Sequence, residues 1–168
     1  RTPHVWAIIN GENKAGITAH IIDAGCDTGN IIHQIEMPIE RDDTGATMLK
    51  KYEKEYYPLV KKVLKDVTNN EIHLTTQNES DATYFGKRTP ADGEINWDWT
   101  KEDIRNWIRA QAHPYPGAFT FYNNQKIIID KVSFSEKKTS SKQVNGEIIQ
   151  VKPKIVIKTK NGAINLDL

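Results

Sequence analysis

The 168 residues are enough to bury a hydrophobic core without a disulfide or a structural metal. The single cysteine, Cys26, excludes an internal disulfide and favours a reducing compartment, so we expect a cytoplasmic protein. A net charge of +1, from 23 basic and 22 acidic residues, argues against a chain built as a whole around nucleic acid or an anionic membrane. No apolar run approaches the roughly 18 residues of a membrane-spanning helix, and we expect no signal peptide, since the opening residues do not show its pattern.

The first half of the chain is predicted to alternate between helix and strand around one polar loop. Apolar residues at steps of three or four indicate helices, and alternating patterns indicate strands. The expected elements in chain order are a helix over residues 4–10, strands over 16–22 and 31–39, and a helix over 44–67. Asp43 or Thr44 can cap the second helix, and Pro58 should kink it. The glycine-containing loop 23–30 lies between the two strands.

The second half is predicted to be one helix followed by β-structure. Thr100 and Asp103 form a capping-box-like start for a helix over residues 100–112. Five short strands are expected over residues 118–122, 126–134, 146–151, 154–160 and 163–168. Asn161-Gly162 is a hairpin signal, because both central residues of the preferred turn need positive φ. Short strands after a helix suggest a small OB-like β-barrel or a curled sheet.

The loop from Asp23 to Asn30 carries the residues with the clearest chemical meaning. Taken alone, Asp, Gly, Thr and Asn are the residues of any tight turn, so a purely structural loop is the alternative. In context, residues 16–32 read Gly-Ile-Thr-Ala-His-Ile-Ile-Asp-Ala-Gly-Cys-Asp-Thr-Gly-Asn-Ile-Ile. This segment closely resembles the strand, loop and strand signature of the folate-dependent formyltransferases, which include methionyl-tRNA formyltransferase and the sugar-nucleotide N-formyltransferases.

Three further stretches resemble the same family in the same order. Residues 1–12 resemble the segment after the family's Asn-x-His-x-Ser-x-Leu-Pro stretch, and residues 84–97 and 109–119 resemble the passage from the catalytic to the C-terminal domain. The resemblance implies an α/β fold. It places the C-terminal part of a Rossmann-like formyltransferase domain at residues 1–90, and a linker helix with a small OB-like β-barrel domain at residues 91–168.

The resemblance also implies a site for formyl transfer from N10-formyltetrahydrofolate to a primary amine. Of the family's catalytic asparagine, histidine and aspartate, the matching aspartate is Asp27. Amide and imidazole donors stabilise the oxyanion, and a carboxylate beside the imidazole helps it take the proton of the amine. The backbone of Ala24, Gly25, Cys26 and Asp27 would contact the pterin. Arg1 would approach the acceptor, with a plain surface arginine as the alternative, and no metal is expected.

The sequence contains no Asn-x-His-x-Ser-x-Leu-Pro segment and does not begin with Met. We therefore expect these residues to be part of a longer chain and to lack catalytic activity as they stand. His20 lies on a predicted buried strand, so we expect a hydrogen-bonded core histidine rather than a catalytic one. Four tryptophans can stack on a nucleobase, but core packing is the preferred interpretation for Trp6, Trp97, Trp99 and Trp107.

The acceptor is expected to be a small amino-sugar nucleotide, because residues 85–97 resemble that branch of the family. Methionyl-tRNA is the main alternative. From Phe134 onward seven lysines oppose three acidic residues, which suits phosphate contacts, although a solvated lysine-rich sheet face explains the same pattern. A further alternative is a non-catalytic fragment that acts as a folate-binding or assembly module. No membrane partner is expected, and a homodimer is left open.

Overall fold

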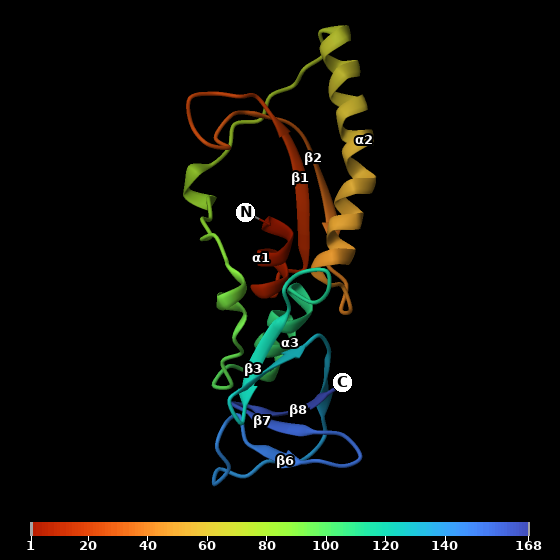
Figure 1. The fold of residues 1–168 in the computed structure, drawn as a ribbon. Helices are drawn as coiled ribbons and strands as arrows, with labels where there is room; N and C mark the ends of the chain where they lie inside the picture. Colours follow the sequence, from red (N-terminus) through yellow and green to blue (C-terminus); the bar gives the residue numbers. More distant parts are fainter. Residues whose placement is uncertain (1, 168) are drawn as a thin grey trace.

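Two groups of buried apolar side chains organise the chain, one on either side of a pair of short helices. The structure is a computed structural model and describes residues 2–167. Figure 1 shows a long helix and a β-hairpin at one end of the molecule, a β-rich unit at the other, and helices α1 and α3 between them. The helices are α1 (Pro3–Ile9), α2 (Gly45–Asn69), α3 (Lys101–Ala110), η1 (Glu79–Asp81) and η2 (Pro90–Gly93).

The hairpin that carries the polar loop is formed by β1 (Lys14–His20) and β2 (Ile31–Pro38). The two strands pair antiparallel from Lys14 opposite Pro38 onward. The register shifts between Ala19 and His20, at the point where the loop begins. Both strands that the alternating pattern predicted are confirmed, and the loop joins them at one end of the hairpin.

Helix α2 packs along the hairpin through its first half. Thr44 caps it, since its side chain accepts a hydrogen bond from the Thr47 amide while the Thr44 backbone N–H donates one to the Thr47 hydroxyl. Met48 and Tyr52 are buried against the hairpin and α1, whereas much of the second half of the helix is exposed. Pro58 lies inside the helix and does not end it.

One hydrophobic cluster joins α1, the hairpin and α2. Its buried members, here called the N-terminal cluster, are Val5, Ile8, Ile17, Met37, Met48, Tyr52, Leu59 and Ala110. His4 is buried beside this cluster, with its ring edge-on to Tyr52 at 5.6 Å and its Nε2 atom 2.7 Å from the Tyr115 hydroxyl. The short helix α1 is therefore fixed by contacts to both α2 and the segment after α3.

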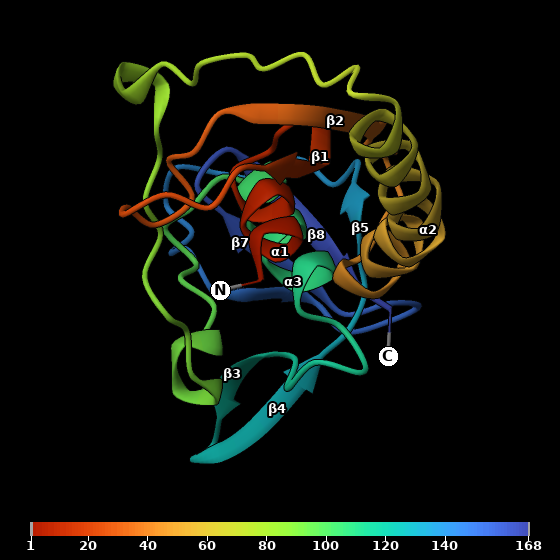
Figure 2. The same ribbon diagram turned by 90° about the horizontal axis from the view of Figure 1, so that it is seen from above.

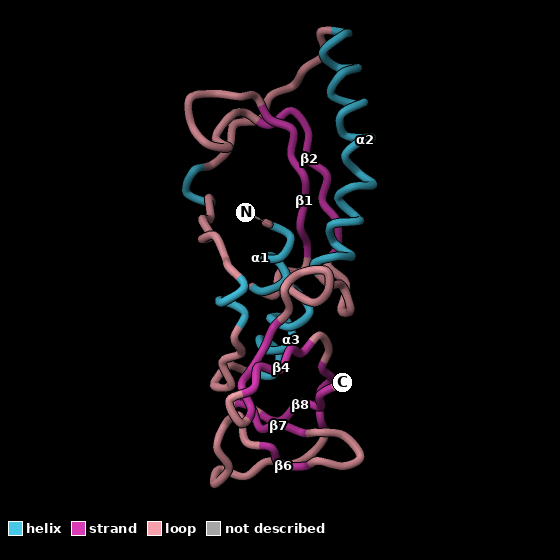
Figure 3. Tube along the Cα trace, in the orientation of Figure 1, coloured by secondary structure: helices cyan, strands magenta, loops and turns pink. Residues whose placement is uncertain are grey.

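A long connection leads from α2 to the second half of the molecule. It contains little secondary structure apart from η1 and η2, as Figure 3 shows. In the view from above, this connection leaves the end of α2, follows the outer side of β2 and returns past the loop of the hairpin (Figure 2). A short antiparallel bridge between Ile31 and Thr75 ties it to the start of β2.

Up to residue 167, the last that the structure describes, the C-terminal half holds six strands rather than the five predicted. They are β3 (Ala118–Tyr122), β4 (Gln125–Ile129), β5 (Val132–Ser135), β6 (Ile148–Gln150), β7 (Val156–Thr159) and β8 (Gly162–Leu166). The expected strand over residues 126–134 is divided, because Asp130 and Lys131 separate β4 from β5. The two strands then join different sheets, β4 with β3 and β5 with β8.

The turns of the β3–β4 and β7–β8 hairpins use different backbone conformations. Asn123 and Asn124 both have positive φ, at 49° and 60°, which is the geometry that a two-residue turn between twisted strands prefers. The β7–β8 hairpin is confirmed, but Thr159 pairs with Gly162, so its loop residues are Lys160 and Asn161. Among the described residues with positive φ, neither Asn161 nor Gly162 appears, and the predicted turn type is therefore wrong.

The OB-like barrel is not confirmed. Within residues 2–167, the C-terminal strands form a two-stranded sheet, β3-β4, and a four-stranded sheet in the order β5-β8-β7-β6, with no ladder that closes them into a barrel. Helix α3 packs its apolar face on this β-structure. The resulting C-terminal cluster consists of Ile95, Ile104, Ile108, Ala118, Ile129, Val132, Ile157, Ile164 and Leu166. The fold is thus mixed α/β.

Two arginines on α3 connect the halves of the molecule. Arg109 donates hydrogen bonds to the carbonyl oxygens of Asp43 and Glu40, at 2.7 and 3.3 Å. Arg105 donates to the Asp42 carboxylate at 2.7 Å. Burial lowers the pKa of Arg109, and the neighbouring Arg105 lowers it further. These bonds fix α3 against the loop that precedes α2.

We predict that acidification destabilises the protein through His4. Burial lowers the pKa of His4 below its ordinary value of 6.5, so the unfolded chain binds this proton more tightly than the folded chain does. The contribution is fully present above pH 6.5 and is lost as the pH falls below it. The free energy of unfolding in urea, measured from about pH 8 to about pH 5, should fall. His4→Gln should weaken this dependence, whereas His113→Gln, at an exposed site, should retain it. Equal pH dependence in the wild type and His4→Gln would contradict the assignment.

Candidate functional site

The loop between β1 and β2 is organised from within by Asp23. Its Oδ1 atom accepts hydrogen bonds from the Gly25 amide at 3.1 Å and from the Thr28 hydroxyl at 2.7 Å. The bond from Thr28 is the main cause of a lowered pKa at Asp23. Asp23 therefore remains ionised and fixes the first turn of the loop.

The base of the loop leaves no room for a side chain at Gly29. The Ile21 amide donates to the Asn30 carbonyl at 2.9 Å and closes the loop. A Cβ atom added to Gly29 would lie 1.7 Å from the Ile21 carbonyl oxygen, which is far inside van der Waals contact. Only glycine permits this approach of the two backbone segments.

Asp27 lies at the tip of the loop in the left-handed conformation, with φ at 61°. Its side chain is 88% exposed, so the carboxylate is accessible to solvent and is not part of a buried structural contact. His20 is the imidazole beside it, with Nε2 3.7 Å from Asp27 Oδ1 and Nδ1 2.9 Å from the Ile21 carbonyl oxygen. His20 is half-buried rather than part of the core, which corrects the sequence-based expectation.

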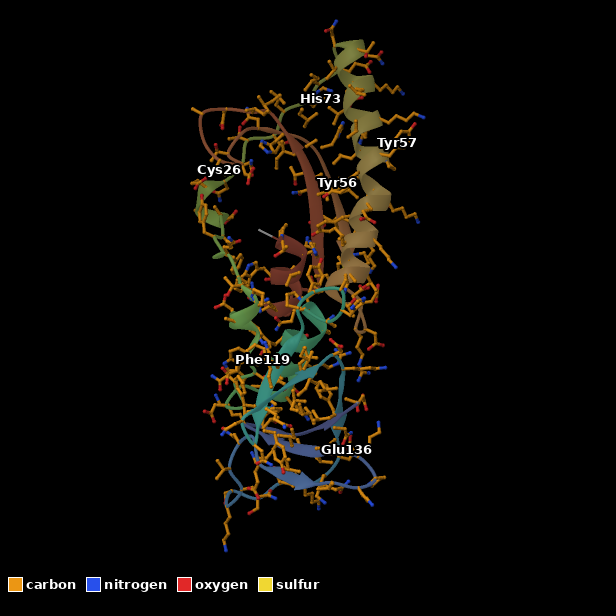
Figure 4. The ribbon with its side chains drawn as sticks, viewed as in Figure 1. Cys26, Tyr56, Tyr57, His73, Phe119 and Glu136 are labelled. Carbon is orange, nitrogen blue, oxygen red and sulfur yellow. The ribbon has the colours of Figure 1, made fainter. Side chains whose placement is uncertain are left out.

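A pocket of about 970 Å³ opens beside Asp27. Figure 4 labels Cys26 where the loop approaches the segment around η1. The lining residues come from α1, the loop, β2 and the connection after α2. They are Pro3, Trp6, Cys26, Asp27, Thr28, Ile31, Gln34, Thr76, Gln77, Asn78, Glu79, Asp81, Ala82, Thr83, Tyr84 and Phe85.

Aromatic side chains form one wall of this pocket. Trp6 stacks on Phe85 with ring centroids 5.0 Å apart and an interplanar angle of 21°. The Trp6 indole N–H donates to the Gly86 carbonyl at 3.3 Å, which holds the connection against α1. Tyr84 donates its hydroxyl to Glu79 at 2.9 Å, and this bond raises the pKa of Tyr84. The wall thus offers flat apolar surface with a protonated phenol beside it.

The charged groups on this pocket are carboxylates. Asp27, Glu79 and Asp81 line it, and the described lining residues include no lysine or arginine. Such a surface suits an amine and can accept a proton from it. Within residues 2–167, no group of three or more His, Cys, Asp or Glu side chains is arranged to hold a metal ion.

The structure brings only some of the predicted site residues to the pocket. Cys26 and Asp27 line it, while Ala24 and Gly25 lie on the exposed first turn of the same loop. Arg1 lies outside the described residues. The functions assigned to these residues remain predictions.

Sequence reasoning missed most of the pocket wall. Gln77 lies in a polar connection whose composition gives no signal, because its partners on the loop are 50 and 48 residues away. Trp6 lines the pocket instead of joining the core. The other three tryptophans, Trp97, Trp99 and Trp107, pack against the C-terminal cluster as expected.

Among the described helices, none is both long and apolar enough to cross a membrane.

Comparison with known proteins agrees with this arrangement of loop, hairpin and C-terminal β-unit. Residues 1–64 match the family described as formyl transferase, and residues 87–168 match the formyl transferase C-terminal domain. Together the two matches cover most of the chain. The chain belongs to the formyl transferase family.

Solved structures show the same similarity. An N-formyltransferase from Helicobacter canadensis, solved with folinic acid and dTDP-3-aminofucose, is 26% identical over 99% of this chain and 60% of that chain, with a TM-score of 0.77. WlaRD, a sugar 3N-formyl transferase solved with dTDP and 5-N-formyl-THF, is 26% identical over 99% and 59%, with a TM-score of 0.76. Methionyl-tRNA formyltransferase from Clostridium thermocellum is 25% identical over 81% and 58%, with a TM-score of 0.63. The present chain spans about 60% of the length of the first of these structures.

We predict that Gly29→Ala disrupts the loop. The added Cβ would collide with the Ile21 carbonyl oxygen, so the free energy of unfolding in urea should fall by about 2 kcal/mol. Gly86→Ala is the matched control, because a Cβ at Gly86 meets no atom within 4 Å. Equal stability of the two variants would show that the loop closure at Gly29 is not required.

Proposed function

We propose that the protein that carries this chain transfers a formyl group from N10-formyltetrahydrofolate to a primary amine, with Asp27 in its active site. The observation that carries the proposal is the exposed Asp27 carboxylate on the wall of a pocket of about 970 Å³. Membership of the formyl transferase family supports it, and so do the folinic acid and 5-N-formyl-THF bound in similar structures.

The volume of the pocket and its flat apolar wall support a folate as its ligand. Its volume lies at the upper end of the roughly 300 to 1,000 Å³ typical of ligand sites. The exposed backbone of residues 24–27 offers donors and acceptors for the pterin edge, and Trp6 with Phe85 offers a flat apolar surface. No metal is needed, because the reacting formyl group is already activated on N10.

Asp27 acts on the proton of the attacking amine. As the new N–C bond forms and the bond from the formyl carbon to N10 breaks, the amine must lose a proton and N10 must gain one. A carboxylate beside an imidazole raises its basicity and helps this transfer. The family's Asn-x-His-x-Ser-x-Leu-Pro segment is not among these 168 residues, so the catalytic asparagine and histidine would have to come from outside them.

The preferred acceptor is an amino-sugar nucleotide. The two sugar N-formyltransferases reach higher TM-scores over more of the chain than the methionyl-tRNA enzyme does. Three lysines of the basic tail also have partners within the C-terminal half. Lys158 is buried on Asn145 and the Thr159 carbonyl, Lys154 pairs with Asp167, and Lys137 donates to Gln150. These contacts support a structural role for three of the seven lysines. The similarity to the Clostridium enzyme keeps methionyl-tRNA as the second candidate.

We also propose that residues 1–90 and 91–168 are separate domains. The N-terminal and C-terminal clusters support this division, because Ala110 alone among their members crosses it. The C-terminal domain would then be a variant of the OB type, with its strands held as two sheets.

We predict that Asp27→Asn lowers kcat for formyl transfer by about 100-fold or more, because the amide cannot assist the proton transfer. The readout is mass-spectrometric detection of the formylated acceptor, made with the native protein that carries this chain. Binding of 5-formyltetrahydrofolate, measured by calorimetry, should change little, since the backbone of the loop is retained.

Asp130→Asn, at an exposed aspartate in the C-terminal half, is the control and should leave kcat unchanged. The assay is run with a dTDP-linked or UDP-linked amino sugar and with methionyl-tRNA, and the higher kcat/KM identifies the acceptor. Wild-type activity in Asp27→Asn would refute the catalytic assignment.

A further inference from the structure

The connection after α2 makes one inward contact opposite the Asp27 loop. Over residues 67–87, all of which the structure describes, every residue is exposed except Gln77. A polar side chain that is half-buried within so exposed a segment has a specific partner. In the view from above, the connection passes the loop that joins β1 to β2 (Figure 2). The hydrogen bonds of Gln77 place its side chain against that loop.

Gln77 uses its side-chain amide to hold the backbone of the loop on both sides of Thr28. Its Nε2 atom donates to the Asp27 carbonyl oxygen at 2.8 Å and to the Gly29 carbonyl oxygen at 2.7 Å. A primary amide carries two N–H donors on one nitrogen and no charge, so both donors are used here.

The backbone that carries Gln77 is itself anchored. Two residues earlier, Thr75 and Ile31 exchange backbone hydrogen bonds at 2.8 and 2.9 Å. Because Ile31 begins β2, this bridge fixes the connection to the same hairpin that carries the loop. Gln77 therefore reaches the loop from a fixed point.

The position of the Asp27 carboxylate depends on this backbone. Its side-chain contacts, 3.7 Å to His20 Nε2 and 3.9 Å to Cys26 Sγ, are longer than a strong hydrogen bond to a carboxylate. Asp27 also has positive φ, a conformation that aspartate adopts at some energetic cost. The hydrogen bond to its carbonyl oxygen stabilises this conformation and so sets the direction of the carboxylate.

We infer that Gln77 is the positioning residue for Asp27, which it orients through two hydrogen bonds to the loop backbone. The inference rests on the proposed function and adds a determinant of its rate. Gln77 acts on the Asp27 and Gly29 carbonyl oxygens, so its effect on catalysis passes through the loop. The effect of residue 77 on kcat then depends on how many N–H donors its side chain offers to these two carbonyl oxygens.

The test compares Gln77→Met, which removes both donors, with Gln77→Glu, which places a carboxylate against two carbonyl oxygens. In the native protein that carries this chain, kcat should fall by about 10-fold for Gln77→Met and by about 100-fold for Gln77→Glu. The KM for the acceptor and the thermal midpoint should stay near wild type. Gln125→Glu, on the exposed β3–β4 hairpin, is the matched control and should leave kcat unchanged.

A double-mutant cycle shows whether Gln77 acts through Asp27. In an Asp27→Asn background, Gln77→Glu should cause no further loss of kcat, because there is no carboxylate left to position. Independent and multiplicative losses would overturn the inference. Equal kcat in Gln77→Glu and the wild type would overturn it as well.

Hydrogen–deuterium exchange separates this inference from the proposed function. Gln77→Glu should speed exchange of the amides in residues 23–30 and leave that of α2 unchanged. If the wild type transfers no formyl group, the proposed function fails. Even then, faster loop exchange in Gln77→Glu supports the contact between Gln77 and the loop, and unchanged exchange refutes it. Should the wild type be active and Gln77→Glu retain both its kcat and its loop protection, only the positioning assignment fails.

Discussion

The site depends on hydrogen bonds to the backbone of one loop rather than on burial of its side chains. Asp23 fixes the first turn, the bond from Ile21 to Asn30 closes the base, and Gln77 holds the carbonyl oxygens on either side of Thr28. Because of these hydrogen bonds, the Asp27 side chain is exposed to solvent while the backbone that carries it keeps a fixed orientation. A carboxylate that must meet a substrate needs both properties, because a buried one could not reach the amine and an unconstrained one would seldom face it.

The rest of the fold supplies a firm base for that loop. The hairpin is held on one side by the N-terminal cluster, in which Ile8 and Met48 are fully buried. Helix α3 joins this base to the C-terminal half through Arg105 and Arg109, whose partners lie in the loop before α2. The connection after α2 closes the pocket from the other side and brings Phe85 onto Trp6. The pocket is thus assembled from segments far apart in the sequence.

Local patterns in the sequence predicted the elements well and their long-range partners poorly. Helical spacing located α1, α2 and α3, and alternation located the strands of the β1–β2 hairpin, because these signals depend on near neighbours. The break at Asp130 and the turn at Lys160 were missed, since strand pairing decides them. Family resemblance predicted Asp27 as the site residue, but no local pattern distinguishes Gln77 from the other polar residues of its segment. Its contact exists only after the connection has folded back onto the hairpin.

The most direct test of the account is a crystal structure of the native protein that carries this chain, with 5-formyltetrahydrofolate bound. We expect the pterin to lie against the backbone of residues 24–27 and the formyl group to face the Asp27 carboxylate, inside the pocket that Trp6 and Phe85 border. A folate bound elsewhere, with Asp27 directed into solvent and the loop unchanged, would contradict the central claim that this loop is built to present a catalytic carboxylate.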